Sequence, residues 1–85
     1  MKNEEIIARA AVQVGMLTEE EAKKLMDAGK EISLHTLQGW KSRGDYQVKD
    51  GEQPVEVKLW KKKEDGGFYL AKARLYSEKQ LMRIG

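Results

Sequence analysis

The side chains of this chain that could do chemistry are aromatic rings and cations, and most of them lie in residues 40–76. That segment contains both tryptophans, all three tyrosines and the only phenylalanine. Lys58 precedes Trp60 by two residues, and Lys61, Lys62 and Lys63 follow it directly. Rings of this kind can stack on unpaired bases while cations meet phosphates, so the combination is typical of surfaces that bind single-stranded nucleic acid.

Patterns for catalysis or metal binding do not occur in the sequence. The chain has no cysteine and one histidine, His35. A lone histidine needs several carboxylate partners to hold zinc. No serine, aspartate or glutamate stands at a spacing that would make His35 part of a triad. We therefore expect a nonenzymatic protein without metal or cofactor, in which His35 is a surface residue at the start of a helix.

A β-hairpin is required to place the candidate binding residues on one surface. Apolar and polar residues alternate over 55–62 and again over 68–77, which is the period of strands with one buried face. Residues paired directly across a hairpin share a face, so apolar odd-numbered positions must pair with each other. The predicted core face consists of Val55, Val57, Leu59, Ala71, Ala73 and Leu75.

The length of the loop selects among registers of this hairpin. A two-residue turn would place a lysine opposite Leu59 and bury it, whereas a three-residue loop over Asp65–Gly67 pairs Leu59 with Ala73. We predict this register or another of the same parity. It places Trp60 across from Lys72, and Lys58 across from Arg74, on the other face. The predicted platform consists of Lys58, Trp60, Lys72, Arg74 and Tyr76, with Lys61, Lys62 and Lys63 extending its positive field towards the loop.

A different interpretation of the same face is that it is an ordinary solvated surface. Sheet faces that carry Lys, Arg and Glu are commonly of this kind. Phe68 and Leu70 on this face would themselves need cover, and Trp60 could be covered by the N-terminal or C-terminal segment. The exposure of Trp60 decides between the two interpretations.

Two helices are predicted before the hairpin. Apolar residues recur at helical spacing from Asn3, a candidate N-cap, to Val14, and Gly15 follows. The second helix opens with a capping box of Thr18 and Glu21 and ends before a glycine at position 29. The apolar stripes are expected to contain Ile6, Ile7, Ala10, Ala11 and Val14 in the first helix, and Ala22, Leu25 and Met26 in the second.

A third helix is predicted over residues 31–43, starting near Ser33 or Thr36 and burying Trp40. Gly39 lowers its propensity but would permit another element to approach closely. A short strand at 46–48, a turn at Asp50-Gly51 and a short C-terminal helix over 77–82 complete the expected elements.

Together these elements predict one α+β domain over residues 1–85. A helical hairpin (1–30) and a third helix pack on a small antiparallel sheet built around the β-hairpin, and a short C-terminal helix follows. The helical hairpin could alternatively be a DNA-reading helix-turn-helix. Three glutamates at the start of its second helix argue against that use, because they would face phosphates.

Composition agrees with a soluble domain. Of 85 residues, 40% are hydrophobic and 35% charged, and no apolar run is long enough to span a membrane. We expect a cytoplasmic protein with no membrane partner. The net charge is only +2, but residues 1–38 carry a balance of −2 and residues 39–85 a balance of +4. An anionic partner is therefore expected to contact the C-terminal half.

Residues 34–84 resemble the N-terminal domain of the antirestriction protein ArdC and its phage and plasmid relatives. The likeness is carried by Thr36–Lys41, by Tyr46–Glu52 with its Gln-Val-Lys run, and by Leu70–Gln80. The resemblance implies an α+β fold, a mobile-element origin and binding of single-stranded DNA without sequence preference. The family's metalloprotease-like domain has an H-E-x-x-H motif that this chain lacks, so protease activity is not implied.

On this resemblance four residues match the family motif: Gln47, Lys49, Gly51 and Trp40. Lys49 and Gln47 are implied to contact phosphates, whereas Gly51 is more simply a turn residue and Trp40 more simply a core residue. The expected function is therefore nonenzymatic binding of single-stranded DNA. The alternative is a protein-interaction or host-inhibitor module, with a homodimer through the edge of the hairpin as one form.

Overall fold

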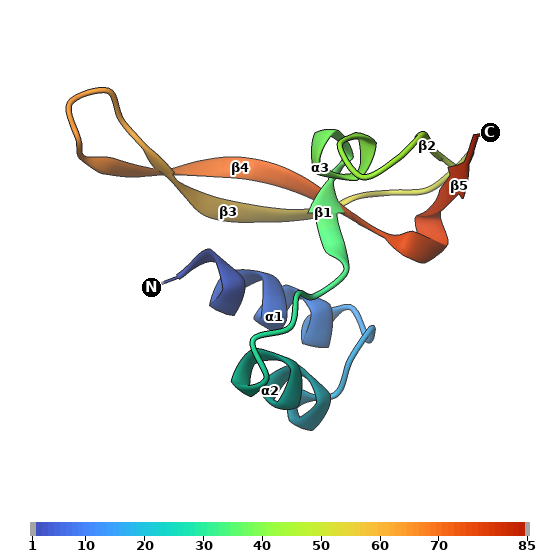
Figure 1. Ribbon diagram of the computed structural model, residues 1–85, viewed down its shortest axis with the longest axis horizontal. Coiled ribbons are helices and arrows are strands. Elements are labelled where there is room, and N and C mark those ends of the chain that lie inside the picture. The colour runs from blue at the N-terminus through green and yellow to red at the C-terminus, as the bar shows by residue number, and fades with distance from the viewer. Residues whose placement is uncertain (1, 85) are drawn as a thin grey trace.

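The computed structural model describes residues 2–84, which form an α+β fold (Figure 1). The predicted fold class is confirmed. The three-stranded sheet has the order β1-β4-β3, and β2 pairs with β5 in a two-stranded sheet. The elements are α1 (Asn3–Gln13), α2 (Glu19–Asp27), β1 (Leu34–Thr36), α3 (Leu37–Lys41), β2 (Tyr46–Val48), β3 (Val55–Lys62), β4 (Phe68–Ser77), the short 3-10 helix η1 (Glu78–Gln80) and β5 (Leu81–Arg83).

The predicted helical hairpin forms, and the capping box starts its second helix. The Thr18 hydroxyl accepts a hydrogen bond from the Glu21 N–H at 3.1 Å, and the Glu21 carboxylate accepts one from the Thr18 N–H at 3.0 Å. These bonds satisfy amide groups that a helix start leaves without intrahelical partners. Gly15 and Gly29 follow α1 and α2 in the left-handed region, with φ of 79° and 67°. Both helix ends are therefore as predicted.

The start of α1 differs from the prediction, because its N-cap is Lys2 and Asn3 is already helical. The Asn3 side chain instead bonds the backbone of Trp60 on β3. The apolar stripes are also narrower than predicted, since Val14 is 50% and Met26 37% exposed. Small side chains let the helices pack closely, and the buried residues of the pair are Ala8, Ala10, Ala11 and Ala22.

The segment predicted as a third helix over 31–43 is partly a strand. β1 pairs antiparallel with the end of β4, with Leu34 opposite Ser77, and α3 begins only after Thr36. Pairing prevails over helical spacing here because the edge of β4 away from β3 is open to a partner, and Leu34 becomes fully buried on it. Thr36 caps α3 by accepting a hydrogen bond from the Gly39 N–H at 3.1 Å.

The C-terminal segment is also more extended than predicted. A capping bond forms, with the Ser77 N–H donating to the Gln80 side chain at 2.9 Å, but the helix is the single turn η1. The chain then extends as β5, which pairs Leu81 with Val48 of β2. A three-residue strand such as β2 has backbone groups that need partners. The strand predicted at 46–48 is thus confirmed, and the predicted short C-terminal helix forms only over Glu78–Gln80 rather than over 77–82.

The hairpin of β3 and β4 has the predicted parity in a register shifted by two residues. Leu59 lies opposite Ala71 rather than Ala73, and Val57 lies opposite Ala73. Odd-numbered residues therefore pair with each other, as predicted. The same side chains face the core in both registers, because a shift of two keeps each residue on its face.

The position of the loop explains the shift. The Lys63 N–H donates to the Gly67 carbonyl at 2.7 Å, so the three loop residues are 64–66 rather than 65–67. Gly66 has φ of 92° and takes the left-handed position of this loop. The Asp65 carboxylate accepts a hydrogen bond from the Gly67 N–H at 2.9 Å, which holds Gly67 outside the turn.

The core lies between the helical hairpin and the three-stranded sheet (Figure 1). Leu34 and Leu75 are its most buried large side chains, at 0% and 1% exposure. A second buried group on the α3 side of the sheet contains Trp40 and Leu81. The Trp40 ring meets that of Tyr46 edge-on at 5.1 Å, and the expected core position of Trp40 is confirmed.

Candidate nucleic-acid interface

Among residues 2–84, helices cover one face of the three-stranded sheet, and the other face is covered only at its β1 end. The helical hairpin lies against the first face, and α3 lies over β1 on the second (Figure 1). Farther along β3 and β4, every even-numbered residue of the second face is exposed. We call this surface the open face; it consists of Glu56, Lys58, Trp60, Lys62, Phe68, Leu70, Lys72 and Arg74.

The paired side chains of the open face change character along the hairpin. The predicted pairs of Trp60 with Lys72 and of Lys58 with Arg74 are wrong, because the register is shifted by two. The cationic pair, Lys58 with Lys72, lies nearer to β1, and the apolar pair, Trp60 with Leu70, lies nearer to the hairpin loop. From the β1 end, the pairs are Glu56 with Arg74, Lys58 with Lys72, Trp60 with Leu70, and Lys62 with Phe68.

Trp60 is open to solvent, and so are its apolar neighbours. Trp60 is 37% exposed, Leu70 47% and Phe68 64%. The N-terminal segment does reach this point, but Asn3 bonds the backbone of Trp60 rather than its ring. Side by side, these three side chains make an exposed apolar patch bordered by lysines. Such patches mark interaction sites more often than scattered apolar residues do.

Charges next to this patch favour an anion. Lys58 and Lys72 lie directly opposite each other, and like charges in this position destabilise a sheet by about a few tenths of a kcal/mol. The next pair is an ion pair, with the Arg74 Nε 3.8 Å from the Glu56 carboxylate. Both side chains are well exposed, so this ion pair contributes little to stability. A phosphate beside each lysine would relieve their repulsion.

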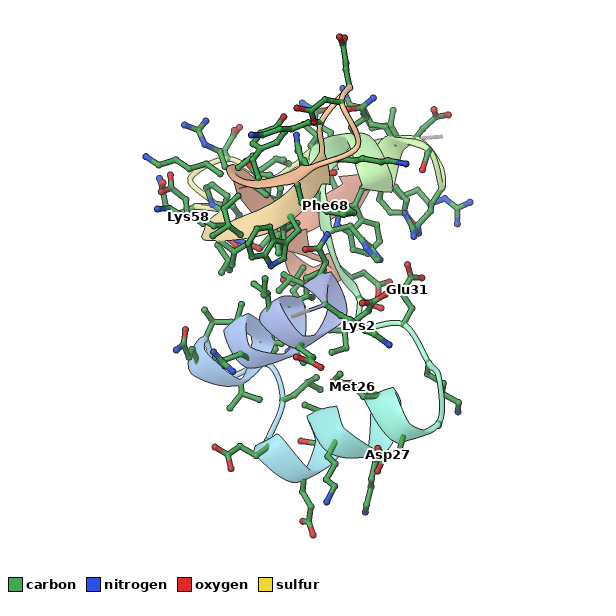
Figure 2. All side chains as sticks on the ribbon, turned by 90° about the vertical axis from the view of Figure 1, so that its left-hand side faces the viewer. Lys2, Met26, Asp27, Glu31, Lys58 and Phe68 are labelled. Carbon is green, nitrogen blue, oxygen red and sulfur yellow. The ribbon has the colours of Figure 1, made fainter. Side chains whose placement is uncertain are left out.

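The far end of the hairpin projects beyond α1 and twists as it does so (Figure 1). Viewed from that end, Lys58 and Phe68 lie in the sheet layer, above both helices of the hairpin (Figure 2). Lys61, Lys62 and Lys63 are all exposed there. Lys62 shares the open face with Trp60, whereas Lys61 lies on the other face, opposite Tyr69.

Tyr76 lies at the closed end of the face. It is half-buried and paired with His35 of β1, and its carbonyl accepts a hydrogen bond from the Trp40 indole N–H at 2.8 Å. Trp40 in turn meets the ring of His35 at 5.0 Å. Tyr76 therefore lies at the border of the open face, next to His35 and Trp40, which cover the face at its β1 end.

Gln47 and Lys49 are placed away from the other predicted site residues. Both are exposed, and they belong to β2 and the turn after it, at the end of the molecule opposite the hairpin loop (Figure 1). The Lys49 N–H donates to the Gln80 carbonyl at 2.9 Å. Gly51 has φ of 82°, which agrees with its expected place in a turn. The fold thus separates Gln47 and Lys49 from the open face.

His35 lies on the strand β1, whereas the sequence predicted it at the start of a helix. Burial lowers the pKa of His35, the positive charge of Arg43 lowers it further, and Glu31 opposes both effects. On balance these effects favour the uncharged imidazole. Its Nε2 lies 3.7 Å from the Glu31 carboxylate, which also binds Arg43. Within residues 2–84, no three potential metal ligands come together.

A pocket of about 560 Å³ opens between the start of α1, the end of α2 and the segment leading to β1. Lys2, Met26 and Glu31 border it in Figure 2. Its rim has Lys2 and Lys30 but also Glu4 and Glu31. These opposite charges balance, so the pocket attracts neither anions nor cations in particular.

Two features of the site were not predicted. The alternation of the hairpin placed Phe68 and Leu70 on the basic face, but they were expected to need cover rather than to extend the platform. The role of Asn3 has no signal in the local sequence, because an asparagine before a helix is typical of an N-cap. Its actual partner lies 57 residues away along the chain.

Within residues 2–84, no helix is both long and apolar enough to cross a membrane. Compared with protein families, with curated proteins and with solved structures, the chain finds no match in any of the three.

Proposed function

We propose that this protein is a nonenzymatic module that binds single-stranded nucleic acid, with single-stranded DNA of any sequence as its ligand. The observation that carries the proposal is the exposed ring of Trp60, which forms an apolar pair with Leu70 on the open face, next to the cationic pair of Lys58 and Lys72. Exposed rings stack on bases irrespective of sequence, and neighbouring cations meet the backbone.

The order of the pairs indicates how a strand would lie. Successive pairs on one face are about 7 Å apart along a strand. Phosphates would lie at Lys58 and Lys72, and bases would extend from there over Trp60, Leu70 and Phe68. The nucleic acid would then cross the hairpin rather than follow it, and its footprint would be short. With two phosphates neutralised, the logarithm of affinity should fall with the logarithm of salt with a slope of about −1.4.

DNA rather than RNA, and a setting in a phage or another mobile element, are the parts of the proposal that come from the resemblance to the ArdC N-terminal domain. That resemblance covers residues 34–84, which include the whole open face. The features of the open face itself suit either nucleic acid, because stacking and phosphate contacts do not involve the 2′-hydroxyl.

The test measures the fluorescence of the two native tryptophans and its quenching by acrylamide. Trp40 is 5% and Trp60 37% exposed, so acrylamide should quench mainly Trp60. Oligothymidine should protect this fluorescence from acrylamide, with an affinity that weakens as salt rises. Oligouridine, titrated in parallel, separates DNA from RNA. Unchanged quenching at tens of micromolar oligonucleotide in low salt would refute the proposal.

A protein-interaction module is the second candidate function, and the position of β3 favours it. β3 is an outer strand of its sheet, so its free edge could pair with an extended segment of another protein or of a second copy. Size-exclusion chromatography with light scattering tests the homodimer. A dimer that persists in high salt would support this function, and a monomer at all concentrations would exclude the homodimeric form.

A further inference from the structure

Asn3 holds the backbone of Trp60 in the way that a neighbouring strand would. Its side-chain Oδ1 accepts a hydrogen bond from the Trp60 N–H at 2.8 Å, and its Nδ2 donates to the Trp60 carbonyl at 3.1 Å. One amide group therefore satisfies both backbone groups of one strand residue. An exchange of this kind is the normal unit of an antiparallel pair.

The bonds lie on the outer edge of β3. In an antiparallel pair, residues that exchange hydrogen bonds alternate with residues whose backbone groups point away. Lys63 bonds Gly67, so the odd-numbered residues of β3 bond β4. Even-numbered residues, Trp60 among them, turn their backbone groups to the free edge. Asn3 reaches Trp60 on that edge from the first residue of α1.

Trp60 lies at the point beyond which the helices no longer cover the hairpin. Residues 61–70 are exposed throughout, and the hairpin projects beyond α1 there (Figure 1). Fixing both backbone groups of Trp60 also fixes the direction of its Cα–Cβ bond, and hence where the ring can lie. Without Asn3, the hairpin could twist at this point, because Trp60 would be held only by its own strand pair.

We propose that Asn3 is a positioning residue for the binding surface, which holds the Trp60 ring over the open face through the two backbone hydrogen bonds. The inference rests on the proposed binding of single-stranded nucleic acid. It assigns to the helical hairpin a part in binding that the open face alone does not reveal. The bonds also occupy the free edge at Trp60, which opposes pairing with another strand at that residue.

The test compares Asn3→Ala and Asn3→Asp with Gln13→Ala in the whole chain. Alanine has a higher helix propensity than asparagine, so Asn3→Ala should not weaken α1 itself. Asn3→Asp keeps an acceptor for the Trp60 N–H but loses the donor. Gln13→Ala removes an exposed amide from the other end of the same helix, and it controls for the loss of a polar side chain.

Hydrogen exchange of the Trp60 amide is the first measurement, and oligothymidine affinity is the second. Asn3→Ala should speed exchange at Trp60 at least about tenfold and weaken oligothymidine binding about three- to tenfold, mainly through faster dissociation. Asn3→Asp should protect the Trp60 amide but still weaken binding. Gln13→Ala should match the wild type in both measurements, and circular dichroism melts should show all variants folded.

The possible failures are distinguishable. If the wild type binds oligothymidine and Asn3→Ala binds equally well despite faster exchange at Trp60, Asn3 is not a positioning residue and the proposed function stands. Unchanged exchange at Trp60 in Asn3→Ala would also overturn the inference. If the wild type does not bind oligothymidine at all, the proposed function fails, and the positioning role fails with it.

Discussion

The two tryptophans show how one residue type serves two purposes in this chain. Trp40 is buried between His35 and Tyr46, and its indole N–H donates to the Tyr76 carbonyl. A buried tryptophan needs such a partner for its polar atom. Trp60 is 37% exposed. At the residue scale, therefore, Trp40 supports the fold and Trp60 is available for a ligand.

Replacing Trp60 with alanine should weaken oligothymidine binding by about 1–3 kcal/mol, the usual contribution of one stacked base. Trp60→Phe should recover part of the loss, since a smaller ring still stacks. Urea unfolding should show both variants folded, with a stability loss below the roughly 3–5 kcal/mol that truncation of a buried tryptophan costs, because the ring is partly exposed. Unfolding of Trp60→Ala, or wild-type affinity in that variant, would contradict the assignment.

Trp40→Phe is the matched control for these two variants. It leaves the Tyr76 carbonyl without its donor, which should cost about 1–3 kcal/mol of stability. Oligothymidine affinity should be unchanged under conditions where the variant is folded. The two tryptophans are thus expected to separate stability from binding.

Stability should depend on the protonation of His35. The pKa of His35 is lowered in the folded protein, chiefly by burial and next by Arg43, whereas an unfolded histidine has a pKa of about 6.5. Below pH 6.5 the unfolded chain thus binds the proton more readily, and folding loses stability as pH falls. Urea unfolding at pH 7.5 and 5.5 should show this loss.

Two measurements check the role of His35 in that pH dependence. His35→Gln should remove most of the stability difference between pH 7.5 and 5.5, because glutamine does not titrate. The single histidine can also be followed directly by NMR. A His35 pKa at or above 6.5 would contradict the expected effect.

At the scale of elements, the position of one glycine sets the register of the hairpin. Gly66 has φ of 92°, a conformation that other residues adopt only with strain. The loop therefore centres on residues 64–66. Because the sequence offers two adjacent glycines, it permitted two loops of equal length, and the alternation of the strands was compatible with both.

Gly66→Ala should destabilise the loop by about 1 kcal/mol, through strain at the positive φ alone. A Cβ at this position would meet no atom within 4 Å, so crowding is not a factor. Gly66→Asn should cost less, because asparagine tolerates the left-handed region. Hydrogen exchange of residues 61–70 measures the effect locally. Equal exchange in both variants would contradict this explanation.

At the scale of the whole molecule, the fold collects cations that the sequence distributes along the chain. Lys58 and Lys72 become direct neighbours on β3 and β4. Lys49 is carried instead to the opposite end of the molecule (Figure 1). The net charge of +2 hardly indicates a nucleic-acid binder, so the local arrangement, rather than the total, determines where an anion would bind.

Lys72→Gln should reduce both oligothymidine affinity and its salt dependence, with the slope closer to zero by about 0.7 for the phosphate contact removed. Lys30→Gln makes the same change of charge in the segment after α2, away from the open face. It should leave the slope as in the wild type. Titrations at several salt concentrations provide the comparison. Equal slopes for the two variants would place the phosphates elsewhere.

The sequence by itself determined the fold class, the helical hairpin and which residues of β3 and β4 share a face. These features depend on short-range signals: Thr18 and Glu21 cap a helix three residues apart, and alternation with a period of two survives any shift of register that keeps parity. Such signals require no knowledge of distant segments.

The tertiary structure alone decided which distant segments meet. Leu34 is part of a strand because the edge of β4 was open to a partner. Asn3 bonds the backbone of Trp60 instead of capping α1. Tyr76 is half-buried on the side of the sheet where α3 lies. Each outcome depends on backbone groups or surfaces that remain unpaired elsewhere in the fold. Local residue spacing cannot predict these unpaired groups and surfaces, because they exist only after the sheet has assembled.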